Sequence, residues 1–294
     1  MANRAPRRKR RKEKQEKAFE AKQISTRRPF LFFALAGLLL AGVPVRLSSL
    51  DRSLWLDEAW VANSIQSASL YQSFYYDHWL QTTPPLFITI SRLITNLFGT
   101  SNIAFRALPA LAGILSILLF SVVALRLLKP SYAMTAILLF VFNPRLILYS
   151  QSLKQYSTDV FSTVSFMVLG HMYMERRTDR WFYALLAGFM ALSFLAYPTI
   201  LFFPFLLYAA VARFAVRPDT GVDRRTVYRI GLRLALAVAA GCFVGAINYW
   251  FFIQPNKSPA LVEFFLEGFH QGGSMSEFLK FYGGRLLTVP GIVF

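Results

Sequence analysis

Two adjacent carboxylates, Asp57 and Glu58, stand in the stretch 53–60, just after an apolar segment at 30–48. An ionisable residue beside a membrane-length segment is a functional candidate, and a positioned carboxylate can take the proton of a reacting hydroxyl. Consecutive helical residues point about 100° apart, so the two are not expected to contact one atom. Asp57 is the candidate base, with a helix N-cap as the alternative. Glu58 is the second catalytic candidate: it could orient Asp57, bind a metal, hold an acceptor, or only favour the positive end of a helix.

The elements that position this pair are expected to be membrane helices. Hydrophobic residues make up 55% of the chain and charged residues 16%, whereas soluble domains are nearer a quarter charged. Apolar segments occur at about 30–48, 86–98, 107–125, 132–149, 157–174, 181–196, 198–212 and 231–253. The fold class is therefore an all-α, polytopic membrane protein, because a span needs roughly 20 apolar residues.

The segment 86–98 is too short to span, and Arg92 lies in its middle. If it lies on the surface, with the N-terminus cytoplasmic, the basic loops after the later segments all fall inside, as the positive-inside rule requires. This choice predicts about seven spans in a multi-pass protein of the inner or plasma membrane, with an outer loop at 49–106. Within that loop, residues 58–75 are predicted to be helical, with Trp60, Ile65, Leu70 and Phe74 facing the membrane.

The net charge of +17 is concentrated at the N-terminus, where residues 1–28 hold twelve Lys or Arg and three Glu. We expect this tail to be disordered and to touch anionic lipid, not nucleic acid. Residues 29–253 then form the membrane core and 254–294 an extracytoplasmic segment. The chain ends as another apolar stretch begins, which predicts an incomplete C-terminal part.

Four motifs occur in order: Leu54 to Trp60, the pair Pro84-Pro85 before the short helix, Phe105 to Gly113, and Tyr149 to Tyr156. Together they resemble the GT-C glycosyltransferases that use lipid-phosphate sugars, above all the protein O-mannosyltransferases and aminoarabinose transferases. The resemblance implies a GT-C-like membrane core. It also implies transfer of a sugar from a polyprenyl-phosphate donor to a glycan, lipid or protein hydroxyl of the cell envelope, with the first-loop Asp57 as base.

The resemblance also implies groups that hold the donor phosphate and sugar. We expect Lys154, Arg145, Tyr156 and Asp159 in this role. Lys154 stands where related sequences often carry Arg, while Ser152 replaces an acidic residue of the family pattern. Arg145 could instead snorkel to lipid headgroups, and Asp159 could instead cap a helix. Arg106 has the same ambiguity and is interpreted as an interfacial anchor.

No cofactor is expected from the sequence, and a divalent metal stays open. His78 is the candidate ligand, with Asp77 or Glu58 beside it; a packed or interfacial histidine is the alternative. Two functions compete with the transferase: a transporter, and a degenerate relative that binds polyprenyl lipid without activity. Paired repeats, which transporters commonly show, are absent from this sequence.

Overall fold

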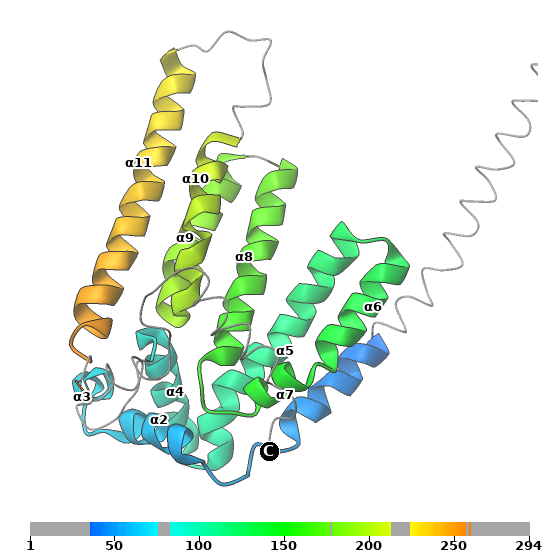
Figure 1. The fold of residues 1–294 in the computed structure, drawn as a ribbon, viewed down its shortest axis with the longest axis vertical. Helices are drawn as coiled ribbons and strands as arrows, with labels where there is room; N and C mark the ends of the chain where they lie inside the picture. Colours follow the sequence, from blue (N-terminus) through cyan, green and yellow to red (C-terminus); the bar gives the residue numbers. More distant parts are fainter. Residues whose placement is uncertain (1–35, 76–82, 177, 213–223, 257–258, 260–294) are drawn as a thin grey trace, which may run out of the picture.

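The structure is a computed structural model that describes residues 36–75, 83–176, 178–212, 224–256 and 259, and all regular structure within these ranges is helical. Long helices run side by side, and short helices gather across one end of them (Figure 1). The elements are a first helix at Ala36–Leu47, then α2 (Leu56–Gln66), α3 (Leu70–Phe74), α4 (Pro85–Phe98), α5 (Asn102–Leu127), α6 (Pro130–Val141), α7 (Pro144–Ser150), α8 (Tyr156–Arg176), α9 (Asp179–Leu195), η1 (Tyr197–Phe202), α10 (Phe203–Ala212), α11 (Arg224–Ile247) and the π-helical η2 (Asn248–Ile253).

Two of the described helices are long and apolar enough to cross a membrane: Asn102–Leu127 and the continuous stretch Arg225–Ile253. Helices α6 and α7 add a third crossing if the pair, bent by 51°, is one span. The expected number of about seven spans is therefore not confirmed. Helix α9, for example, has only 17 residues, and α8 carries polar side chains such as Asp159 and His171.

The short helices lie together at one end, which we call the Asp57 end. Helix α4 begins with Pro85 at its first position, where the missing N–H costs nothing. The single helix expected at 58–75 is instead two helices, because Ser69 caps a new start by accepting from Gln72 N at 3.2 Å. Nor does Ile65 face the membrane: it is buried against α4 residues such as Phe87.

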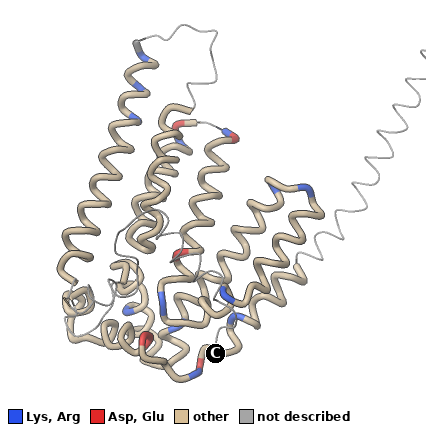
Figure 2. The backbone as a smooth tube through the Cα atoms, viewed as in Figure 1, with Lys and Arg blue, Asp and Glu red and all other residues tan. Residues whose placement is uncertain are grey.

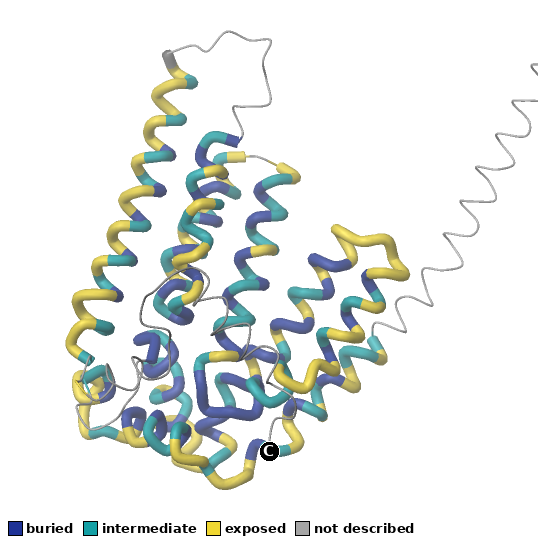
Figure 3. Tube along the Cα trace, viewed as in Figure 1, coloured by how far each residue is buried: buried dark blue, intermediate teal, exposed yellow. Residues whose placement is uncertain are grey.

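Helix α8 packs against both α5 and α9, whereas α11 exposes much of its surface (Figure 3). One buried cluster joins α8, α9, α10 and α11 around Phe166, Phe182 and Phe189. A second joins α2, α4 and α5 with Leu153 of the loop between α7 and α8. This second cluster fixes the short helices on the ends of the long ones.

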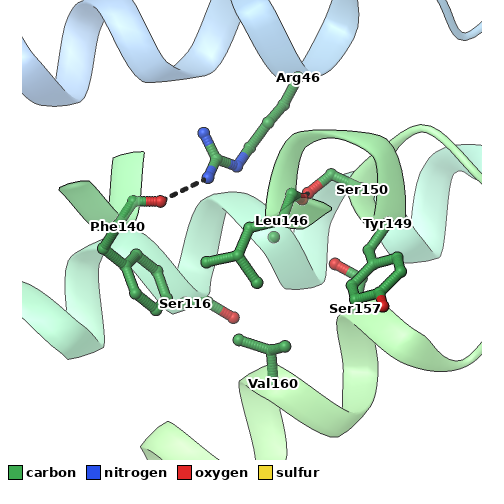
Figure 4. Close-up of a pocket in the computed structure, with 9 residues that line it drawn as sticks. Arg46, Ser116, Phe140, Leu146, Tyr149, Ser150, Ser157 and Val160 are labelled. Carbon is green, nitrogen blue, oxygen red and sulfur yellow. Dashed lines mark hydrogen bonds between the residues drawn. The ribbon is translucent and has the colours of Figure 1, made fainter. Parts of the chain in front are cut away.

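The break between α6 and α7 follows from Asn143-Pro144. The residue before a proline is driven to extended backbone, and Asn143 has φ −64° and ψ 119°. Its side chain then caps α7. The buried Arg46 of the first helix donates to the carbonyl of Val141 at 2.9 Å and to that of Phe140 at 3.5 Å, the second of which Figure 4 shows. Two of the terminal carbonyls of α6 thereby gain a partner.

Candidate active site

Lys154 and Asp57 meet at the Asp57 end. The ammonium nitrogen of Lys154 lies 3.7 Å from Oδ2 of Asp57, with the Asp57 side chain 36% exposed and that of Lys154 10%. Asp57 is the second residue of α2, and the N-cap of this helix is Trp55. The capping alternative for Asp57 is thus excluded, and its carboxylate is open to a ligand on one side.

Glu58, the next residue, turns inward as the helical angle predicts. Its carboxylate and the guanidinium of Arg106 are both 0% exposed, and two bonds join them: Nη2 to Oε2 at 2.7 Å and Nε to Oε1 at 3.0 Å. Arg106 also donates to the carbonyls of Leu50 and Ser53. The interpretation of Arg106 as an interfacial anchor is therefore wrong, because its charge is neutralised inside the protein.

The oxygens of Glu58 serve two further donors. The backbone N–H of Leu153 donates to Oε1 at 2.6 Å, and that of Trp55 donates to Oε2 at 3.3 Å. The second contact satisfies a free N–H at the start of α2. With four donors around it, the carboxylate of Glu58 is placed to hold the backbone, and its burial does not fit the expected catalytic contact with substrate.

The loop 151–155 is held against the segment 45–52 by further contacts that the sequence did not reveal. Arg52 donates to the carbonyl of Gln151 at 3.2 Å and to Oγ of Ser152 at 3.1 Å. The amide of Gln151 donates to the carbonyl of Val45 at 2.7 Å. These partners stand about a hundred residues apart, so no local pattern could have found them.

Close packing between α5 and the end of α7 also positions the same loop. A Cβ added at Gly113 of α5 would lie 2.0 Å from Oγ of Ser150, the residue directly before the loop. Gly113 and Ser150 also line a cavity of about 10 Å³ with Arg46, Ser116 and Ser157 (Figure 4). Such a space holds about one water molecule, so it is a packing feature and not a substrate site.

Tyr156 and Asp159 follow Lys154 in the first turn of α8. The Tyr156 side chain is exposed, and its ring centroid lies 5.0 Å from that of Tyr149. The exposed fraction of Tyr156 is 41%, so the phenol is still partly buried. This partial burial, with the nearby charge of Asp57, raises the pKa of the Tyr156 phenol, which keeps it a hydrogen-bond donor. Oδ1 of Asp159 is buried and accepts no hydrogen bond from any described residue.

Burial and neighbouring charges act on the pKa of Lys154 in opposite directions. Burial lowers the pKa of its ammonium group, and the carboxylates of Asp57 and Glu58 oppose this effect. The net effect is a pKa below the usual value for lysine.

Arg145 and His78 are the remaining predicted residues, and of these two the structure describes only Arg145. Arg145 lies at the start of α7 with its side chain exposed, and no described residue forms an ion pair with it. His78 falls outside the described residues, so the metal hypothesis for it stays a prediction. Among the residues that are described, no group of three His, Cys, Asp or Glu could hold a metal ion.

Comparison with known proteins gives one match. The dolichyl-phosphate-mannose-protein mannosyltransferase family matches residues 82–244, which is more than half of the chain. No curated protein and no solved structure matches significantly. The match includes Arg106, Lys154 and Asp159, and it begins at residue 82, downstream of Asp57 and Glu58. Together with the apolar helices, it identifies a membrane protein of the glycosyltransferase class. The chain belongs to the dolichyl-phosphate-mannose-protein mannosyltransferase family.

Proposed function

We propose that the chain transfers a sugar from a polyprenyl-phosphate donor to an acceptor hydroxyl on the outer side of the membrane, with Asp57 as the general base. The observation that carries the proposal is the pair of Asp57 and Lys154, 3.7 Å apart and partly open, at the end of the membrane helix α5. A donor anchored in the bilayer presents its phosphate and sugar at this level.

In the proposed reaction the acceptor oxygen attacks the anomeric carbon while Asp57 takes the hydroxyl proton. The bond between that carbon and the phosphate oxygen breaks, and polyprenyl phosphate leaves with the electron pair. Lys154 stabilises the charge that develops on the phosphate. The phenol of Tyr156 is a further donor, and the buried oxygen of Asp159 is an acceptor for a sugar hydroxyl.

Glu58 takes a positioning role in this proposal instead of the catalytic role expected from the sequence. Its bonds to Arg106 and to the N–H of Leu153 fix the loop whose next residue is Lys154. Asp57 is held by the same helical turn. The buried carboxylate of Glu58 thus holds both Asp57 and Lys154 in place.

The test is donor turnover by the purified full chain with a panel of polyprenyl-phosphate sugars, read as release of polyprenyl phosphate. We expect Asp57→Asn to lower the turnover number by about 10²–10⁴, with thermal unfolding unchanged. Asp51→Asn is the matched control, since Asp51 lies in the same segment and is exposed. Near wild-type turnover by Asp57→Asn would overturn the mechanism. Donor binding without turnover by the wild type would instead favour a lipid-binding relative that has lost activity.

A further inference from the structure

An apolar groove lies on the side of the helices, far from Asp57 and Lys154. Helices α5 and α8 form its walls through Val123, Leu127, Met167 and Met174, and Phe202 and Phe205 close it from η1 and α10. Its volume is about 400 Å³. With a rise of about 1.5 Å per residue, Val123 lies about 25 Å along α5 from Arg106. The groove is therefore at the opposite end of the membrane helix, which we call the Arg126 end.

The groove is open to the side. Leu127 is 58% exposed and Met167 41% exposed, although both line it. At the floor of the groove, α8 and the ring of Phe205 pack closely at Gly170. A Cβ at Gly170 would lie 2.9 Å from Cε1 of Phe205. Since α5 is long and apolar enough to cross the bilayer, a groove on its flank meets lipid chains and not water.

Charge gathers at the rim of this groove. Arg126 directly precedes Leu127, and its Nη1 donates to Glu175 Oε2 at 2.8 Å. His171 lines the groove and lies 3.1 Å from the other oxygen of Glu175. Arg176 follows directly, with its guanidinium 5.7 Å from the ring of Trp181. The rim therefore carries more positive than negative charge, and Figure 2 shows basic residues at this end of the helices.

We propose that the groove binds an anionic glycerophospholipid of the adjoining leaflet, with one acyl chain between α5 and α8 and the phosphate at Arg126. An apolar slot beneath a basic rim matches both parts of such a lipid. A lipid without net charge would fill the slot but gain nothing at the rim. The site is distinct from the donor site, since about 25 Å of helix separates them.

The test is a titration of the full chain, in uncharged detergent, with phosphatidylglycerol or phosphatidylcholine, with bound lipid counted by native mass spectrometry. One basic residue near a membrane surface favours anionic lipid about fivefold. The wild type is expected to retain phosphatidylglycerol at least about fivefold better. Arg126→Gln should remove this preference, and Arg126→Lys should keep it.

A second variant tests the slot itself. Met167→Trp fills the groove from its open side and should lower retention of both lipids. Leu118→Trp is the control, because Leu118 is an exposed apolar residue of α5 outside the groove. Equal retention of the two lipids by the wild type would overturn the proposal. So would unchanged retention by Met167→Trp, the result expected if residues 213–223 of the same chain cover the groove.

Discussion

The backbone N–H of Leu153 donates to Oε1 of Glu58 at 2.6 Å, across 95 residues of sequence. Leu153 itself is fully buried, and Lys154 follows it. The distance between Lys154 and Asp57 is therefore set by a backbone contact to the neighbour of Asp57. Of these two adjacent residues, Asp57 has a partly exposed side chain and Glu58 a buried one.

Glu58→Gln should destabilise the protein strongly. The amide could still accept from Leu153, but Arg106 would become a buried charge without its counter-ion, which costs about 3–5 kcal/mol. We expect a lower unfolding temperature in detergent and loss of transfer. Glu175→Gln is the matched control, because its pair with Arg126 is 43% exposed on both sides and an exposed pair contributes about 0–1 kcal/mol. Equal effects of the two variants would contradict the buried role of Glu58.

Lys154 predicts a pH dependence of donor binding. Its pKa lies below the usual range for lysine because of burial, so the ammonium loses its proton earlier as the pH rises. The KM for donor should therefore increase on the alkaline side before an exposed lysine would titrate. Lys154→Arg should move this limb to higher pH, because arginine keeps its proton. A profile that is identical in the wild type and Lys154→Arg would remove Lys154 from phosphate binding.

Gly113→Ala should disturb the site without touching a charged residue. Its Cβ would overlap Ser150, so α5 and the start of the loop 151–155 must separate. Overpacking of this kind costs about 1–3 kcal/mol, and we expect lower turnover as well. Gly245→Ala on α11 is the control, since nothing lies within 4 Å of its Cβ position and alanine favours a helix. Measurement of unfolding and turnover for both separates crowding from helix propensity.

Asp159→Asn should separate stability from function. A buried carboxylate oxygen without a hydrogen bond is costly, and removing the charge relieves this cost. We expect an unfolding temperature equal to that of the wild type or higher, together with a higher KM for the donor. A loss of stability would instead show that Asp159 supports the fold.

The sequence predicted the all-helical class and the short helix at Pro85–Phe98 because apolar length and proline position are local signals. It also predicted that Asp57 and Glu58 would diverge. It could not predict the burial of Arg106, whose partner stands 48 residues earlier. It also could not predict the hydrogen bond from Arg52 to the carbonyl of Gln151. Nor did it predict that 132–149 would bend into two helices, although Asn143-Pro144 carried that signal.

The ion pair of Glu58 and Arg106 also dictates an order of events during biosynthesis. When Glu58 leaves the ribosome, Arg106 is 48 residues behind it and Leu153 is 95 behind. The carboxylate therefore lacks its Arg106 partner until α5 is synthesised, and its Leu153 donor follows only after α7. Asp57 and Lys154 can therefore come together only after residue 154 has been added, and a nascent chain that stops before residue 153 carries Asp57 and Glu58 without Leu153 and Lys154.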